Sequence, residues 1–240
     1  MRDDLLQVRA PLLNFYVLKD ASGLHLIDSG FIGGIALLRR ALKRRGWQGL
    51  PVRGIILTHG HLDHILNAAA IAREYGAWIA APRLDADHYA GRAAYTGWAR
   101  VTGALEGLGK LLLGFEPFTP VRWIDNGDFL DVWHGLRAVH LPGHTRGHTG
   151  YYCEALKLLF SADLFASYWI HTCRPPVIYN SEPALIPQSI AKALKLDLAG
   201  VVPNHCDRAE PAEHLARLVR LHKKISRREQ SLPPAETKRG

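Results

Sequence analysis

The chain has 240 residues, of which 48% are hydrophobic and 22% are charged, as is typical of soluble globular proteins. This length suffices for one large domain or two small ones, and no apolar run approaches the ~18 residues of a membrane helix. The N-terminus lacks the apolar segment of a signal peptide, and three cysteines are too few for a disulfide framework. These features argue against a membrane partner and predict a cytoplasmic protein.

The formal net charge is +8, and most of the positive charge lies in two segments. Residues 39–45 read RRALKRR, and residues 217–240 hold eight Lys or Arg against two Glu. Charge runs of this kind are usually solvated faces, so we do not expect a nucleic-acid partner. The alternative, a basic surface for a polyanion, stays open.

In chain order, short apolar strands first alternate with amphipathic helices. Gly46 and Gly76 follow the two helical segments and predict where these end. The strands are predicted at 12–18, 24–30, 52–60 and 77–82, and the helices at 33–46 and 63–76.

Residues 84–118 have a mostly helical pattern without a strand, which predicts an inserted helical segment. Two roles for it stay open, a packed cap and a lid over a site. Its large apolar side chains either shape a substrate pocket or belong only to the core: Tyr89, Tyr95, Trp98, Leu108, Leu112 and Phe115.

Strand–helix alternation resumes after this segment and predicts an α/β protein with helices outside its sheets. Residues 1–228 are predicted to form one domain, and residues 229–240 a flexible basic tail. The later strands are predicted at 121–125, 136–143, 149–155, 157–163 and 200–205, and the helices near 184–196 and 210–228.

The strongest local signal is THGHLDH at residues 58–64, where a predicted strand passes into a helix. His59 and His61 are two residues apart, so both point the same way at a strand end. Asp63 and His64 follow in the turn and face a neighbouring position. Imidazole and carboxylate ligands suit zinc, iron and manganese, so the motif predicts a metal site.

Four neighbouring side chains cannot complete two metal shells, so further ligands are expected at other strand ends on the same edge. Polar residues follow three later apolar strands: His144 in AVHLPGHT, Asp163 in KLLFSAD and His205 in GVVPNH.

These motifs together resemble the metallo-β-lactamase superfamily, in particular its glyoxalase II-like and lactonase-like branches. The resemblance implies an αβ/βα four-layer sandwich of two mixed β-sheets with external helices and metals at one edge. The matched motifs are H-x-H-x-D-H at His59–His64, P-G-H-T at Pro142–Thr145, a small residue before Asp at Ser161–Asp163, and Pro-x-His at Pro203–His205.

The resemblance also implies a binuclear centre with two divalent metal ions, zinc first and iron or manganese as alternatives. By that pattern the first ion is held by His59, His61 and His144, the second by Asp63, His64 and His205, with Asp163 bridging both. Two cations roughly 3.5–4 Å apart lower the pKa of a bridging water, which then attacks as hydroxide. Asp63 is the candidate catalytic proton acceptor.

We therefore expect a metallohydrolase that acts on a small ester, thioester or lactone. A metal-dependent phosphodiesterase or nuclease is the alternative. A true β-lactamase is disfavoured, because Asp163 stands where that branch often has a cysteine. A purely structural metal site is also disfavoured, because such sites are usually closed sets of Cys and His.

Four further residues are candidates for supporting roles or for the substrate pocket. Asp28 either orients a ligand histidine or belongs to a simple strand-end turn. His148 is expected to brace the turn after His144 rather than to bind metal. Tyr168 and His171 follow Asp163 and are candidate pocket residues. Cys206 adjoins His205 and is read as a buried thiol rather than a ligand.

Overall fold

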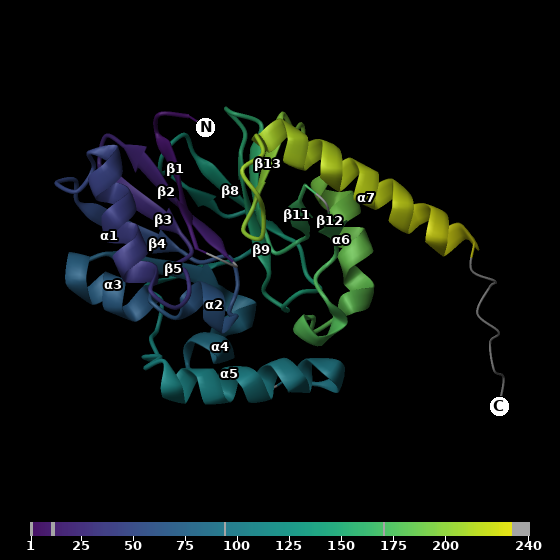
Figure 1. Ribbon diagram of the computed structural model, residues 1–240, viewed down its shortest axis with the longest axis horizontal. Helices are drawn as coiled ribbons and strands as arrows, with labels where there is room; N and C mark the ends of the chain where they lie inside the picture. Colours follow the sequence, from purple (N-terminus) through teal and green to yellow (C-terminus); the bar gives the residue numbers. More distant parts are fainter. Residues whose placement is uncertain (1, 11–12, 94, 170, 232–240) are drawn as a thin grey trace.

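The computed structural model describes residues 2–10, 13–93, 95–169 and 171–231, and in these residues two main β-sheets lie between outer helices (Figure 1). The first sheet is ordered β1-β2-β3-β4-β5-β6 and the second β13-β10-β9-β8-β7. Both are mixed, since each contains parallel and antiparallel neighbours. A short hairpin, β11 (Ala166–Tyr168) with β12 (His171–Cys173), forms a third sheet.

The strands of the two main sheets are short and largely buried. Those of the first sheet are β1 (Leu5–Arg9), β2 (Asn14–Asp20), β3 (Gly23–Ile27), β4 (Val52–Ile56), β5 (Trp78–Pro82) and β6 (Arg122–Ile124). Those of the second are β7 (Phe129–Leu130), β8 (Leu136–His140), β9 (Thr149–Cys153), β10 (Leu158–Ala162) and β13 (Gly200–Pro203).

The helices form the outer layers and the segment between β5 and β6. The α-helices are α1 (Gly34–Arg45), α2 (Leu62–Ile65), α3 (Ala68–Tyr75), α4 (Ala86–Tyr89), α5 (Arg100–Leu112), α6 (Ile186–Ala193) and α7 (Pro211–Ser231). The described residues also contain the 3₁₀ turns η1 (Arg83–Asp85), η2 (Gly97–Ala99), η3 (Val177–Tyr179) and η4 (Pro183–Leu185). None of the helices described is long and apolar enough to cross a membrane.

Three apolar cores separate the four layers. Leu38 of α1 and Ile71 of α3 pack on the outer face of the first sheet. Tyr16 and Tyr151 lie in the core between the two sheets. Ile190 of α6 packs with α7 on the outer face of the second sheet. The predicted αβ/βα sandwich is therefore confirmed.

Several predicted boundaries differ from the structure. The helix predicted at 63–76 is divided into α2 and α3, because Asn67 donates its side-chain amide to the carbonyls of Ser29, Gly30 and Phe31. The strand predicted at 52–60 ends at Ile56, so His59 and His61 lie in the following loop and His64 lies in α2. The sequence does not predict strands β1, β7, β11 and β12.

The end of the domain differs as well. Helix α7 continues to Ser231, whereas the sequence predicted its end at 228, so residues 229–231 of the predicted tail are helical. Arg228 in the last turn favours this extension, because cations stabilise a helix C-terminus. The rest of the predicted tail, 232–240, lies outside the described residues.

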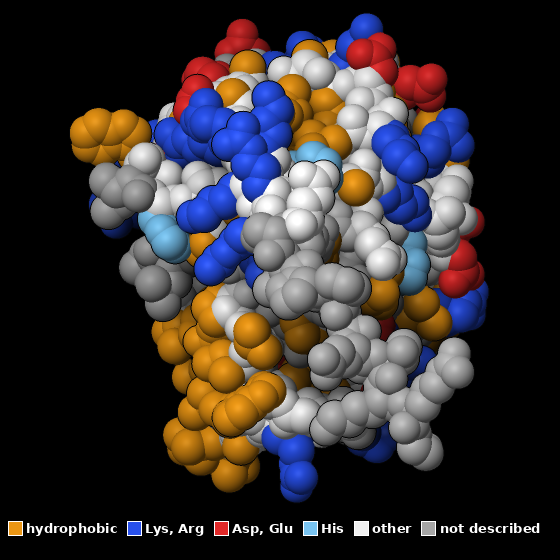
Figure 2. Space-filling model, turned by 90° about the vertical axis from the view of Figure 1, so that its right-hand side faces the viewer, with side chains coloured by type: hydrophobic (Ala, Val, Ile, Leu, Met, Phe, Trp, Pro, Cys, Tyr) orange, Lys and Arg blue, Asp and Glu red, His pale blue; other side chains and the backbone are white. Residues whose placement is uncertain are grey.

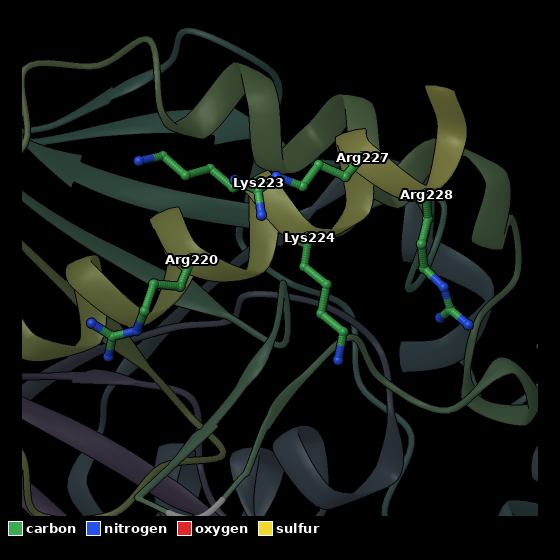
Figure 3. A pocket seen from close by; sticks show the side chains of 5 residues that line it. All are labelled: Arg220, Lys223, Lys224, Arg227 and Arg228. Atoms are coloured by element: carbon green, nitrogen blue, oxygen red, sulfur yellow. The ribbon is translucent and has the colours of Figure 1, made fainter. Parts of the chain in front are cut away.

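The surface separates into basic and apolar areas on one face. Lys and Arg side chains gather on its upper part and hydrophobic side chains on its lower left, at the level of α5 (Figure 2). On the outer side of α7, five cationic residues line a hollow of about 560 Å³ (Figure 3). They are Arg220, Lys223, Lys224, Arg227 and Arg228.

Candidate metal centre

The motif residues lie where strands end on one edge of the two sheets. His59 to His64 follow β4, and Asp163 follows β10 directly. His144 and His205 come shortly after β8 and β13. Loops that follow strand ends in this way bring distant segments to one place, as the sequence predicted.

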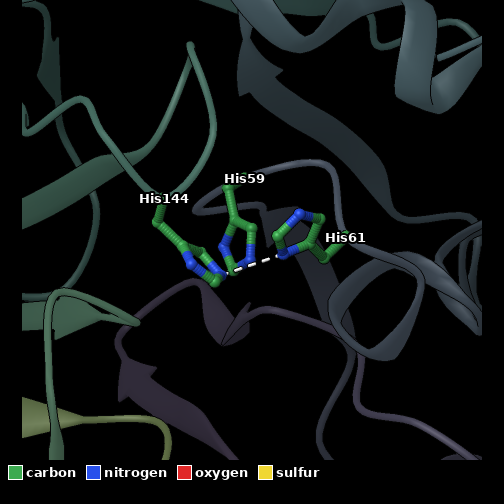
Figure 4. A group of neighbouring side chains, drawn as sticks. All are labelled: His59, His61 and His144. Atoms are coloured by element: carbon green, nitrogen blue, oxygen red, sulfur yellow. Dashed lines mark hydrogen bonds between the residues drawn. The ribbon is translucent and has the colours of Figure 1, made fainter. Parts of the chain in front are cut away.

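The first group of candidate ligands is His59, His61 and His144, all buried (Figure 4). One ring nitrogen from each residue lies within 4.8 Å of the others. His61 Nδ1 and His144 Nε2 are 2.9 Å apart. The three side chains thus converge from two loops that are far apart in sequence.

The second group is Asp63, His64, Asp163 and His205, whose candidate ligand atoms also lie within 4.8 Å of one another. Oδ2 of Asp163 is 2.9 Å from His205 Nε2 and 3.4 Å from His64 Nε2. The same oxygen is 3.4 Å from His144 Nε2 of the first group. Asp163 therefore lies between the two groups, and the resemblance described above implies a bridging carboxylate at this residue.

Asp28 is fully buried and fixes the ring orientation of one histidine in each group. Its carboxylate accepts Nδ1–H of His64 at 2.9 Å and the Thr58 hydroxyl at 2.8 Å. Because the Thr58 proton is used there, its oxygen accepts Nδ1–H of His59 at 3.0 Å. Asn204 donates a further hydrogen bond to Asp28 at 2.7 Å. Nε2 of each histidine is thereby directed at the site, where it can bind a cation once it carries no proton.

His144 is oriented by Asn180, which the sequence did not single out. The Asn180 amide donates to the carbonyls of Pro175 and Pro176, so its Oδ1 faces His144 Nδ1 at 2.9 Å. His144 Nε2 is therefore a lone pair. An asparagine after two prolines carries no signal for this role, because the contact depends on how the loop folds back.

His148 has both ring nitrogens engaged within the protein. Nδ1–H donates to the Leu141 carbonyl at 2.8 Å, and Nε2 accepts the backbone N–H of Asp163 at 3.1 Å. Burial, followed by the charge of His144, lowers the pKa of His148 to about 3, so the ring stays neutral. The structure thus places His148 as a brace between two site loops, with no lone pair for a metal.

Asp85 is a second buried carboxylate that the sequence did not reveal. It accepts the backbone N–H of Gly60 at 2.9 Å, the Thr145 hydroxyl at 2.6 Å and the backbone N–H of Gly147 at 2.7 Å. Gly60 lies between His59 and His61, and Thr145 follows His144. Asp85 thereby joins the two loops that supply the first group.

The segment 84–118 contains α4, η2 and α5, and besides Asp85 it contacts the site through Tyr95 and Glu106. The Tyr95 ring stacks on His61 with centroids 6.2 Å apart, and its hydroxyl donates to Glu106. Glu106 also accepts the backbone N–H of Leu62 at 3.0 Å. These contacts pack the segment against the loop that carries His61.

The other candidate pocket residues lie elsewhere. Tyr168 is half-buried and pairs across the β11–β12 hairpin with His171, which is exposed. Neither belongs to the two ligand groups among the described residues. Tyr89 is fully buried in the first core, Phe115 packs partly against it, and Trp98, Leu108 and Leu112 are exposed. Of the six predicted pocket side chains, Tyr95 is the one that stacks on a candidate ligand.

Cys206 is not a member of the two candidate ligand groups found among the described residues. Its thiol is buried, donates to the Pro203 carbonyl at 3.1 Å and accepts from Gln7 at 3.4 Å. The thiol is thus held against the first sheet.

The histidines of the two ligand groups differ in their charge. Burial lowers the pKa of His59 and of His61 well below its usual value, so both rings are neutral. Burial also lowers that of His64, but Asp163 and its neighbouring carboxylates raise the pKa well above its usual value. At His205 burial is likewise outweighed by Asp163, which raises the pKa to about 9. The positive charge that faces Asp163 outweighs burial in turn and holds the pKa of that carboxyl well below its usual range.

The donor set fits two divalent cations. Nε2 of His59, Nε2 of His64 and Oδ1 of Asp163 are buried without a hydrogen-bond partner among the described residues. In addition, Nε2 of His144 lies 2.9 Å from Nδ1 of His61. Two ring nitrogens this close need a proton or a cation nearby. Imidazole nitrogens and carboxylate oxygens are the ligands that zinc, iron and manganese share.

The four-layer fold with a histidine and aspartate edge defines a class of metal-binding α/β proteins. A family model of the metallo-beta-lactamase superfamily matches residues 12–205, so the chain belongs to that superfamily. A metallo-beta-lactamase family protein of Thermus thermophilus has a TM-score of 0.71 at 22% identity, covering 94% of this chain and 80% of that one. BJP-1, a subclass B3 metallo-beta-lactamase of Bradyrhizobium japonicum, has a TM-score of 0.68 at 20% identity, covering 95% and 91%.

A curated relative matches part of the chain. The hydroxyacylglutathione hydrolase of Rhizobium meliloti (strain 1021) is 31% identical over 128 residues, which is 52% of this chain. The matched region spans 38% of that enzyme's own length. The solved structures establish the fold.

Proposed function

We propose that this chain is a binuclear metallohydrolase that cleaves a small ester, thioester or lactone. A thioester of the hydroxyacylglutathione type is the first choice, because the curated relative named above carries that activity in its name. The observation that carries the proposal is the position of Asp163, whose Oδ2 lies 3.4 Å from a histidine of each ligand group. A carboxylate placed in this way suits two cations held side by side.

The first cation would be held by His59, His61 and His144, and the second by Asp63, His64 and His205, with Asp163 shared between them. Zinc is the first choice, with iron or manganese as alternatives. When bound, two such cations supply Lewis acidity toward a water and toward the carbonyl oxygen of the substrate. Asp28, Thr58 and Asn180 keep the ligand lone pairs aimed at the centre.

Asp63 is the candidate proton acceptor. Its side chain is 33% exposed, whereas that of Asp163 is 6% exposed. Asp63 Oδ2 is 3.6 Å from His64 Nε2 and 3.8 Å from His205 Nε2, so it stands at the open side of the second group. A carboxylate there can take a proton from an attacking water and pass it to the leaving group.

Metal analysis with a substrate panel tests the proposal. The panel holds a hydroxyacylglutathione thioester, p-nitrophenyl acetate, a homoserine lactone and bis(p-nitrophenyl) phosphate. We expect two metal ions per chain, and a drop in kcat/KM of about 100-fold or more in His61→Ala. The matched control is His134→Ala, an exposed histidine paired with Asp4. Protein that binds no metal, or unchanged hydrolysis in His61→Ala, contradicts the proposal.

A phosphodiesterase or nuclease is the second candidate, favoured by the basic hollow on α7 (Figure 3). A polyanion bound along this helix would lose affinity as salt rises, because its counterions are released on binding. Replacement of Lys223, Lys224 and Arg227 by Gln tests this candidate. It is supported if hydrolysis of bis(p-nitrophenyl) phosphate exceeds that of the acyl substrates and hydrolysis of an oligonucleotide falls in the triple variant. It is rejected if acyl hydrolysis dominates.

A further inference from the structure

Helix α5 and the preceding turn η2, which carries Trp98, present their large apolar side chains to solvent. Six large apolar residues between positions 98 and 112 are each 46% to 80% exposed. They are Trp98, Val101, Leu105, Leu108, Leu111 and Leu112. In Figure 2 hydrophobic side chains cover the lower left of the visible face at this level. A continuous exposed patch of this kind on a soluble domain marks an interaction site.

Polar and small residues hold α5 against the body of the protein. Thr102 donates to the Ile178 carbonyl, and Glu106 accepts the N–H of Leu62 at 3.0 Å. Gly109 lies so close to Leu62 that an added Cβ would be 2.9 Å from its Cδ2. The helix is therefore fixed in place without using its leucines. A surface helix normally turns its apolar stripe inward, so the outward stripe needs a partner.

The stripe has the spacing of a helix that packs against another helix. Trp98, Val101, Leu105, Leu108 and Leu112 follow one another at intervals of three and four residues. A large side chain has a surface of ~150–250 Å². Multiplying the exposed fraction of each patch residue by such an area gives an exposed apolar surface of roughly 700 Å². This is close to the ~800 Å² that each partner contributes to a stable interface.

The charges on α5 favour a second copy of the same helix as the partner. Glu106 is buried and Lys110 lies largely covered beside it at 3.7 Å, which leaves Arg100 as the exposed charge of this helix. Two copies can therefore approach without repulsion along the stripe. Helices that lie on membranes instead carry several Lys or Arg along their polar face.

We propose that the protein forms a two-fold symmetric dimer through α5. With antiparallel helices and the axis near Leu105, each Trp98 packs near Leu112 of the other copy. The self-complementary stripe satisfies the requirement that a two-fold interface uses the same patch on both chains. This inference concerns assembly and does not depend on the metal centre or on the substrate.

Sedimentation velocity and light scattering over a wide range of protein concentrations test the dimer. We expect the mass of two chains for the unaltered protein. The double variant Leu105→Asp/Leu108→Asp should raise the dimer dissociation constant roughly 100-fold or more. The matched control is Val121→Asp, which replaces a 75% exposed apolar residue outside α5. A monomer at all concentrations, or an equally tight dimer in the double variant, overturns the proposal.

A cross-link provides a test that does not depend on the charged variants folding. Cys173 is the partly exposed cysteine, whereas Cys153 and Cys206 are buried. Leu105→Cys in a Cys173→Ser background should form a disulfide-linked dimer under mild oxidation, since the residue lies at the axis. Val121→Cys in the same background should stay uncross-linked. Equal cross-linking of both variants, or none at position 105, overturns the proposed geometry.

Discussion

The carboxylate of Asp28 accepts a hydrogen bond from His64 Nδ1 at 2.9 Å, and both side chains are fully buried. The same carboxylate reaches His59 through the Thr58 hydroxyl. One aspartate thus sets the ring tautomer of a histidine in each ligand group. Asp28 has a φ of 64°, a left-handed conformation that the hydrogen-bonding groups around its carboxylate help to maintain.

Asp28→Asn should weaken metal binding at both positions by about 10- to 100-fold, because the neutral amide supports the two tautomers less well. Titration of the metal-free protein with zinc, followed by metal analysis, measures this. Asp131→Asn, at an exposed aspartate, is the control and should change nothing. Weakening at a single position would show that the Thr58 link does not carry the effect to His59.

Asp85→Asn should lower the free energy of unfolding by roughly 2–4 kcal/mol, because a buried carboxylate with three donors becomes an amide that faces the same donors. Chemical denaturation of the metal-free protein measures it. Asp87→Asn, exposed and two residues away, serves as the control. The variant should also bind metal less tightly in the first group, since Asp85 joins its two loops. Unchanged stability would mean that these hydrogen bonds are dispensable.

The variants His144→Gln and His148→Gln should distinguish a histidine that binds metal from one that holds two site loops together. His144→Gln is expected to lose one metal ion per chain, because the lone pair that faces His61 is removed. His148→Gln is expected to keep both ions but to melt at a lower temperature, because its two hydrogen bonds are replaced imperfectly. Metal content and thermal unfolding are the two measurements. Loss of an ion in His148→Gln with unchanged melting would reverse the assignment.

Metal affinity should depend on pH in the second group more than in the first. Burial lowers the pKa of His59 and of His61, so these rings are neutral before a metal arrives. The pKa of His205 lies at about 9, with Asp163 outweighing burial, so at neutral pH a cation must displace its proton. Affinity of the second group should therefore rise as pH increases toward about 9, by about tenfold per pH unit for each proton released.

Calorimetric titration of the metal-free protein in buffers of different ionisation enthalpy counts the protons released by each ion. His205→Gln should remove one of them. The same pH dependence in both groups would contradict the expected difference.

The metal edge of the fold could be predicted because its signals are local. THGHLDH places four candidate ligands in a few residues, and each later ligand follows an apolar run that ends at a polar residue. The convergence of these loops follows from the rule that strand ends share an edge of a sheet. The four-layer arrangement came from the resemblance that those motifs carry.

The supporting residues could not be predicted, because their partners are distant in sequence. Asp85 reaches Gly60 across 25 residues and Gly147 across 62, and nothing around it marks it as buried. The same holds for Asn67, which interrupts a helical pattern to bind the loop after β3. For α5, apolar periodicity indicated a helix but could not show that the stripe faces outward.

Asn14 donates its amide to the carbonyls of Asn204 and Cys206, at 2.9 Å and 3.0 Å, across 190 and 192 residues of chain. These two carbonyls flank His205. A nascent chain that has exposed His59 and His61 still lacks the segment that completes the second ligand group. The start of β2 must meet the loop after β13 before that group exists, so the second cation can bind only after nearly the whole described chain has been synthesised. A fragment that stops before β13 should therefore capture at most one cation.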